Sequence, residues 1–89
     1  MKIEFDDAKD IANREKHGLP LAFGVRLFDD PDLLILPTIR KEDEEERHKA
    51  VGRVEGKLYT AVHVWRGETI RFISVRRSNE SEEKAYHCD

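Results

Sequence analysis

The sequence predicts an α+β fold, with a small antiparallel sheet, two helices near the N-terminus and one helix at the C-terminus. Three observations support this class. Helix start and stop signals fall in the first 30 residues, alternating apolar and polar residues fill 47–76, and acidic residues follow Ser78. The chain of 89 residues is expected to form one domain, 1–89, because this length leaves no room for a second core.

A short strand and a helix are expected at the start of the chain. Ile3 and Phe5 alternate with polar neighbours, as in a strand with one buried face. Asp6 is a suitable helix N-cap, because its carboxylate can accept hydrogen bonds from the free N–H groups of the first turn. The helix is expected to end at residue 16 or 17, because Gly18 can adopt the left-handed conformation that commonly terminates helices.

A second helix and a further strand are expected next. Pro20 suits the first turn of a helix, and Leu33–Leu36 forms an apolar run of strand length that ends before a proline. Residues 38–46 form a polar loop, and its acidic run 42–46 is either solvated surface or a dock for a basic partner. The second helix carries an apolar stripe at helical spacing, formed by Leu21, Val25 and Phe28.

Three consecutive strands are expected over 47–54, 57–65 and 68–76. Glu55-Gly56 and Arg66-Gly67 separate them, and each pair ends in glycine, which readily adopts the positive φ that a two-residue hairpin needs. The strands therefore form an antiparallel meander. Ser78 is expected to cap the final helix, whose first turn is acidic.

The two short loops determine which residues lie opposite each other in the meander. The first hairpin places His48 opposite His63, and the second places Tyr59 opposite Ser74. These four side chains then share one face with Arg76. The other face carries the aliphatic residues that we expect helices to cover, namely Val51, Leu58, Val62, Val64, Ile73 and Val75.

Charge is distributed very unevenly along a chain whose net charge is −3. Residues 1–46 carry 7 basic and 13 acidic side chains, residues 47–79 carry 8 and 2, and residues 80–89 carry 1 and 4. The basic middle block either attracts a polyanion or neutralises the acidic flanks within the fold.

The sequence also indicates a compartment and excludes some classes of site. No apolar stretch approaches the length of a membrane span, and the first residues lack the pattern of a signal peptide. The single cysteine, Cys88, cannot form an intrachain disulfide, which fits a reducing cytoplasm. We expect no metal and no cofactor, because neither Cys/His metal spacing nor a glycine-rich phosphate loop occurs.

Histidines and arginines are the candidate functional side chains of the meander. His48 and His63 could act as acid and base or as metal ligands, or they could be half-buried rings that fill space beside Trp65. Each arginine presents a fork of donors that matches phosphate oxygens, although surface carboxylates are equally suitable partners.

Short motifs over nearly the whole chain form a characteristic series. They are Phe5-Asp6 with Lys9 and Asn13, Lys16-His17-Gly18, Phe28-Asp29-Asp30, Glu46-Arg47 with Val51-Gly52, Ile70 to Arg77, and Glu83 with Tyr86. In this order and spacing they resemble the BrnT family of toxins. One position departs from that family's pattern, because Val64 stands where a threonine is usual.

The resemblance implies a ribonuclease with a fold similar to RelE toxins. It also implies a cognate ribbon-helix-helix antitoxin of the BrnA type, encoded beside the toxin. The complex would repress its own operon, so the toxin would contact operator DNA only indirectly, through the antitoxin.

For cleavage of RNA without a metal, the 2′-hydroxyl of the substrate attacks the phosphate, and the protein moves protons and stabilises charge. On this hypothesis His17 is the acid or base, and Arg47, Arg71 and Arg76 complete the catalytic set. Because Arg76 ends its strand, we expect Arg76→Ala to abolish cleavage with little loss of fold. The RNA-binding candidates are Lys9, Asn13, Lys16 and Arg77.

Two alternatives come from other functional classes. The chain could be an inactive toxin-like module that only pairs with an antitoxin or RNA, which the loss of threonine at Val64 favours. A DNA-binding regulator is a poorer interpretation, because no predicted helix is basic enough to enter a groove.

Overall fold

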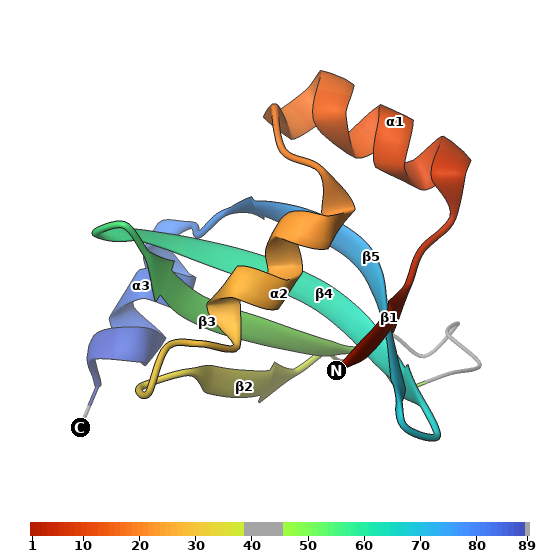
Figure 1. Cartoon of the computed structure of the whole chain (residues 1–89). Coiled ribbons are helices and arrows are strands. Elements are labelled where there is room, and N and C mark those ends of the chain that lie inside the picture. Colours follow the sequence, from red (N-terminus) through yellow and green to blue (C-terminus); the bar gives the residue numbers. More distant parts are fainter. Residues whose placement is uncertain (39–45, 89) are drawn as a thin grey trace.

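A five-stranded sheet forms the centre of the computed structural model, which describes residues 1–38 and 46–88 (Figure 1). The strands are β1 (Lys2–Glu4), β2 (Leu34–Pro37), β3 (His48–Val54), β4 (Lys57–Arg66) and β5 (Thr69–Arg77). They lie side by side in the order β1-β5-β4-β3-β2.

The α+β class is confirmed, but the sheet is mixed and not wholly antiparallel. The pairs β2·β3, β3·β4 and β4·β5 are antiparallel, whereas β1 runs parallel to β5. Short hairpins force consecutive strands to run antiparallel. No hairpin joins β1 to β5, which lie at opposite ends of the sequence, so packing decides their relative direction.

Helix α1 (Asp7–His17) begins and ends where its capping residues predict. The Asp6 carboxylate accepts hydrogen bonds from the backbone N–H groups of Ala8 and Lys9, at 2.8 and 3.2 Å. Gly18 ends the helix in the left-handed conformation, with a φ of 72°. Both signals act through local backbone geometry, which explains why the sequence alone located this helix.

The second predicted helix is shorter and less regular than expected. A 3₁₀ turn, η1 (Leu21–Phe23), leads directly into α2 (Gly24–Leu27). A Cβ on Gly24 would come within 2.5 Å of the Phe72 ring, so glycine permits this close approach to β5. Glycine is also a poor helix former, which agrees with the interruption of the helix at this point.

The first hairpin agrees with its prediction, and the second differs. Glu55 and Gly56 both have positive φ, and His48 pairs with His63 as expected. In the second hairpin Arg66 pairs with Thr69, so the loop is Gly67-Glu68 and not Arg66-Gly67. Glycine therefore takes the first loop position, with a φ of 62°, as in a type II′ turn.

A β-bulge in β5 changes the register along the β4·β5 pair. His63 pairs with Phe72, whereas the preceding residue of β4, Val62, pairs with Ser74. Ile73 is therefore the extra residue. A bulge of this kind exchanges the faces on which all later side chains of the strand lie.

The predicted pairing of Tyr59 with Ser74 is wrong, because Tyr59 pairs with Arg77. Arg76 pairs with Thr60 and so lies on the face opposite to the one we expected. The moved turn and the bulge together change the pairing partners, but only the bulge changes the face, because a shift of two residues preserves the alternation of side chains. The bulge is thus the feature that directs the Arg76 side chain.

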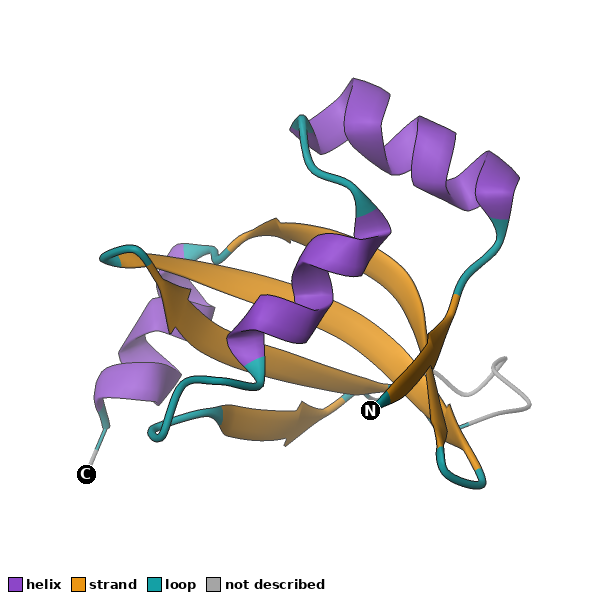
Figure 2. Cartoon of the chain, in the orientation of Figure 1, coloured by secondary structure: helices purple, strands orange, loops and turns teal. Residues whose placement is uncertain are grey.

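Helices pack on both faces of the sheet (Figure 2). The N-terminal helices cover the α2 face, which we define by the β-strand residues Ala50, Gly52, Ala61 and Phe72. Helix α3 (Glu80–His87) packs on the opposite side, the α3 face, which carries Lys49, Val51, Thr60 and Arg76. The main core lies under α2 and contains Leu21, Leu27, Ala50, Val54, Ala61, Ile70, Phe72 and Val75.

We expected helices over the aliphatic face that includes Val51 and Val64, but the N-terminal helices cover the other one. Small residues explain this choice. A Cβ on Gly52 would lie 2.8 Å from the backbone oxygen of Leu27, so the α2 backbone packs directly on the sheet here. Bulky β-branched side chains would hold the helix farther away.

Two further observations bear on the sequence-based expectations. Within residues 1–38 and 46–88, no helix combines the length and the apolar composition needed to cross a membrane. Of the acidic run 42–46, all residues except Glu46 lie outside the part of the chain that the structure describes.

Candidate functional site

A bidentate ion pair joins the end of β5 to the first turn of α3. Arg76 donates from Nη1 to Oε1 of Glu82 and from Nη2 to Oε2, both at 2.7 Å. The Glu82 side chain is only 3% exposed, whereas that of Arg76 is 25% exposed. We expected Arg76 to reach solvent with little role in the fold, but its guanidinium neutralises a buried carboxylate.

Helix α3 holds Glu82 in place through its own N-terminus. Asn79, and not Ser78 as predicted, is the N-cap, and its side chain accepts a hydrogen bond from the backbone N–H of Glu82. The Glu82 carboxylate accepts in return from the backbone N–H of Asn79 at 2.9 Å. This reciprocal capping box fixes the direction of the carboxylate.

Two residues of the α3 face complete the surroundings of Glu82. Thr60 donates from Oγ1 to Oε1 at 2.9 Å, and Lys49 Nζ lies 3.1 Å from Oε2. The single hydroxyl proton of Thr60 is thereby used, so Ser78 is the donor in the 2.8 Å contact between their hydroxyl oxygens. We call Lys49, Thr60, Arg76 and Glu82 the Glu82 cluster.

The electrostatics of this cluster are dominated by the charge on Glu82. Burial alone would raise the pKa of the Glu82 carboxyl, but hydrogen bonds from Arg76, the Asn79 backbone, Thr60 and Lys49 together lower it to about 2. The hydrogen bond to the carboxylate also raises the pKa of Arg76. Glu82 is therefore ionised across the physiological range.

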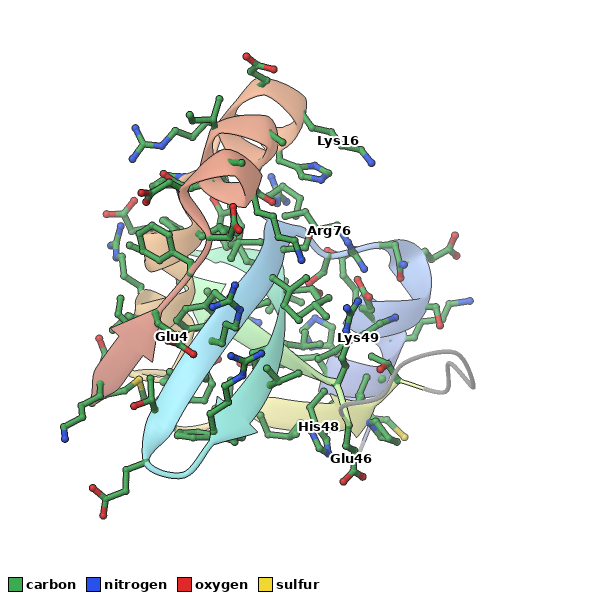
Figure 3. All side chains as sticks on the ribbon, turned by 90° about the vertical axis from the view of Figure 1, so that its right-hand side faces the viewer. Glu4, Lys16, Glu46, His48, Lys49 and Arg76 are labelled. Atoms are coloured by element: carbon green, nitrogen blue, oxygen red, sulfur yellow. The ribbon has the colours of Figure 1, made fainter. Side chains whose placement is uncertain are left out.

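His17 lies beside this cluster at the end of α1. Burial lowers the pKa of His17, and the positive charges of Lys16 and Arg76 lower it further. These effects favour the neutral form of the imidazole. Figure 3 shows Arg76 between Lys16, at the end of α1, and Lys49, on β3, so helix and sheet bring basic side chains to one side of the molecule.

Arg47 and Arg71 lie farther along the α3 face. Arg71 pairs with Val64 on β4, and continuing the β3·β4 register places Arg47 on the other side of Val64. Arg71 Nη1 is 3.7 Å from Oε1 of Glu4, which partly neutralises it. At the spacing of a β-strand, the Cα atom of Arg71 lies roughly 15 Å from that of Arg76, so the two side chains start from well-separated points along the strand.

Arg77 and Lys9 are not brought to the Glu82 cluster. The bulge places Arg77 on the α2 face, where its guanidinium lies 5.4 Å from the centre of the Tyr59 ring and its Nε donates to the Leu58 carbonyl at 3.3 Å. Lys9 is exposed on α1, about two turns before Lys16.

Asn13 lies inside the protein and serves the scaffold. Its side-chain amide donates to the carbonyl oxygens of Leu19 and Val75, both at 2.8 Å. Its oxygen accepts from the Val75 N–H at 3.1 Å, and the residue is 6% exposed. Both amide protons are used within the protein, so none remains for RNA.

The histidine pair lies on the α2 face, away from Glu82. The His48 and His63 rings are 6.2 Å apart, and His63 is 1% exposed. Burial lowers the pKa of His63, and its Nδ1 lies 3.1 Å from the Ala61 carbonyl oxygen, which can only accept. His63 also contacts the Phe28 ring edge-on at 5.7 Å between ring centres, which favours its interpretation as a core side chain.

Sequence reasoning missed Lys49, Thr60 and Glu82 as a group. Part of the signal was present, because Asn79 and Glu82 have the spacing of a capping box. In the described parts of the chain, no three or more His, Cys, Asp or Glu side chains are grouped so that they could hold a metal ion.

Comparison with protein families adds decisive evidence. Residues 5–82 match the family described as ribonuclease toxin, BrnT, of type II toxin-antitoxin system. The chain belongs to the BrnT family. The match includes every residue of the Glu82 cluster as well as His17, and no curated protein shows a significant sequence match to the chain. Membership of the BrnT family indicates a ribonuclease toxin with an antitoxin partner.

Proposed function

We propose that this toxin cleaves RNA in the cytoplasm by metal-independent attack of a 2′-hydroxyl, at a site formed by His17 and Arg76. One observation supports the proposal: the charge of Arg76, whose guanidinium is fixed by Glu82, is among the causes that lower the pKa of His17 and so favour its neutral imidazole. A neutral imidazole can accept a proton, and a guanidinium stabilises charge on phosphate oxygens.

The reaction follows from these two groups. His17 takes the proton of the 2′-hydroxyl, and the 2′-oxygen forms a bond to phosphorus. Arg76 stabilises the additional negative charge on the phosphate oxygens. The bond from phosphorus to the 5′-oxygen breaks, and the 5′-oxygen takes a proton from water. The products are a 2′,3′-cyclic phosphate and a free 5′-hydroxyl.

Other basic residues would hold the rest of the RNA strand. Lys16 lies next to His17, and Arg71 and Arg47 continue the α3 face on both sides of Val64. Their distance from Arg76 suits contacts with neighbouring phosphates, which position the strand without reading its sequence. Lys9 is exposed near the start of α1 and could extend this track.

A ribbon-helix-helix antitoxin is the proposed partner, and the complex would contact operator DNA only through the antitoxin. The basic block 47–79 supports this arrangement, because an acidic segment of the antitoxin can compete there with RNA.

Expression of the toxin alone tests the proposal. Growth should stop, and the purified protein should cleave RNA in the presence of a chelator to give cyclic-phosphate ends. His17→Ala should lower the cleavage rate by about 10²-fold or more while leaving the melting temperature nearly unchanged. His87→Ala, which alters an exposed histidine of α3, is the matched control. Cleavage by His17→Ala at the wild-type rate would remove His17 from the mechanism.

The competing function is an inactive module that only binds its antitoxin or RNA. The Arg76–Glu82 ion pair favours it, because a guanidinium so engaged also serves the scaffold. The missing threonine does not favour the inactive module, because Val64 is 2% exposed and a side chain at this position cannot touch RNA. A wild-type toxin that binds the antitoxin but leaves RNA intact would establish the inactive module.

A further inference from the structure

The Glu82 carboxylate is saturated with donors. Oε1 accepts from Arg76, Thr60 and the Asn79 backbone, and Oε2 accepts from Arg76 and contacts Lys49. A carboxylate offers about four acceptor positions, so no further partner can be added without loss of another. Glu82 is therefore unsuited to accept a proton during catalysis, and a different role has to be found for it.

Both cations that contact Glu82 keep donors for another partner. The end-on contact of Arg76 uses Nη1 and Nη2, which leaves Nε–H and the second Nη2 proton on the adjoining edge of the guanidinium. Among residues 1–38 and 46–88, no acceptor is bonded to that Nε–H. Lys49 is 32% exposed, and of its three ammonium protons only the one directed at Glu82 has a carboxylate partner among these residues.

The two cations lie side by side. The Arg76 Nη2 and the Lys49 Nζ both contact the same oxygen of Glu82, at 2.7 and 3.1 Å. Two positive charges and one negative charge leave the cluster with a surplus of one positive charge. An ion pair alone would have been neutral, whereas this cluster has a net positive charge that attracts an anion.

We propose that Lys49 and Arg76 together bind one phosphate of the RNA, and that Glu82 is the positioning residue that holds these two cations side by side. The inference rests on the proposed function and deepens it, because it adds Lys49 as a catalytic residue that touches the substrate. Thr60 helps to position the Glu82 carboxylate, because its hydroxyl donates to Oε1 while Oε2 contacts Lys49. The phosphate of a diester carries one negative charge, which matches the surplus of the cluster.

Lys49→Gln is the sharpest variant, because Glu82 keeps its pairing with Arg76 and the fold should remain intact. The probe for binding is a 12-residue single-stranded RNA with 2′-O-methyl groups throughout, which cannot be cleaved through its 2′-oxygens. For this variant, the slope of log Kd against the logarithm of the salt concentration should decrease by about 0.7, because one phosphate contact is lost. Cleavage of the unmodified RNA should slow by about 10²-fold.

Matched variants separate a specific contact from a general loss of charge. Lys84→Gln removes one positive charge from α3 at a side chain that is 78% exposed and pairs only with Glu80 among the described residues, so neither the slope nor the rate should change. Lys49→Arg keeps a cation that can reach both Glu82 and a phosphate, so it should retain most of the activity.

Glu82→Gln tests the positioning role, with Glu80→Gln as the control in the same turn of α3. Loss of the carboxylate removes a repulsive charge, so the 2′-O-methyl RNA should bind as tightly as before or more tightly. Cleavage should nevertheless slow, because the cations are no longer held together. A merely structural role would weaken binding and cleavage in parallel. If Glu82→Gln does not fold, the comparison of Lys49→Gln with Lys84→Gln decides the inference.

The outcomes distinguish this inference from the proposed function. If the wild type cleaves RNA and Lys49→Gln cleaves equally well with an unchanged salt slope, the phosphate contact of Lys49 is disproved and the ribonuclease proposal stands. If the wild type cleaves nothing but Lys49→Gln still reduces the salt slope, the ribonuclease proposal fails and the phosphate contact stands.

Discussion

At the scale of single residues, Arg76 illustrates how one side chain serves both fold and site. Its guanidinium neutralises Glu82, which is 3% exposed, and it still presents donors toward solvent. Removing one partner of a buried ion pair leaves an uncompensated charge, which destabilises a protein far more than the loss of a surface charge. A loss of activity after mutation of Arg76 must therefore be separated from a loss of fold.

Arg76→Ala should reduce the free energy of unfolding by about 3–5 kcal/mol, because the Glu82 carboxylate remains buried without its guanidinium. Urea denaturation of the purified variant measures this. Arg14→Ala is the matched control, because the Arg14 side chain is 62% exposed and its pair with Asp10 should contribute about 0.5 kcal/mol or less. Adding Glu82→Ala to Arg76→Ala should restore part of the lost stability. Equal stability of the Arg76→Ala and Arg14→Ala variants would show that the Glu82 ion pair is dispensable for folding.

Stability should fall steeply in acid because of Glu82. The pKa of its carboxyl is lowered from an ordinary value of 4.5 to about 2 in the folded protein. The resulting stabilisation is complete above the unfolded-state pKa and is lost as the pH falls from about 4.5 through about 2. A shift of this size corresponds to about 3 kcal/mol. Unfolding free energies measured across this range should lose that pH dependence in Glu82→Gln and keep it in Glu80→Gln.

Cleavage should show a separate dependence on pH that reports on His17. Burial and the charges of Lys16 and Arg76 lower the pKa of His17 below its ordinary value of 6.5. A general base acts in its neutral form, so the rate should fall as the pH drops through a midpoint below 6.5. The pH–rate profile of the wild type measures this midpoint. A midpoint above 6.5 would argue that another group is the base.

At the scale of elements, β5 connects the parts of the candidate site. Its bulge at Ile73 directs Arg76 toward α3 and Arg77 toward the α2 face. Its backbone at Val75 is tied to α1 through the Asn13 amide. The position of His17 beside Arg76 therefore depends on the Asn13 side chain, although that side chain is remote from any RNA.

Asn13→Ala should destabilise the protein by about 3 kcal/mol or more, because it leaves the Val75 N–H and the carbonyl oxygens of Leu19 and Val75 without this partner. Thermal melting measures the loss, and faster hydrogen exchange of the Val75 amide reports it locally. Glu15→Ala, on the exposed side of α1, is the control. Normal melting together with reduced RNA affinity would instead support Asn13 as an RNA contact, as the sequence first suggested.

At the scale of the whole molecule, charge and helix placement leave different surfaces on the two sides of the sheet. Helices α1 and α2 lie on the side of the sheet that holds the main core, and α3 lies on the other side (Figure 2). Lys49, Arg71 and Arg76 all keep partly exposed side chains on that face. This surface is therefore available to a polyanion.

The antitoxin should cover the α3 face of the toxin. Hydrogen exchange of the complex should show protection in β3 near Lys49 and at the end of β5, and bound antitoxin should displace the 2′-O-methyl RNA. Residues 1–38 carry a net negative charge and would repel an acidic segment of the antitoxin. Their hydrogen exchange should therefore change least. An interface confined to residues 1–38, with the Glu82 cluster still open to RNA, would contradict this prediction.

Much of the fold follows from local signals in the sequence. Asp6 and Gly18 determine both ends of α1, and Glu55-Gly56 determines the register of the first hairpin, including the pairing of His48 with His63. These signals act through backbone conformations and hydrogen bonds between near neighbours, so a single sequence contains them. The series of motifs likewise led to the BrnT family, which the match over residues 5–82 confirms.

Tertiary structure decided the rest. The moved second turn, the bulge at Ile73 and the choice of the face that α2 covers depend on packing between segments far apart in the chain. Because side chains alternate along a strand, one extra residue was enough to move Arg76 to the face where Glu82 lies. The sequence by itself thus determined the family, most of the elements and the basic character of the middle block. Only the folded chain decided which of the basic residues meet a buried carboxylate.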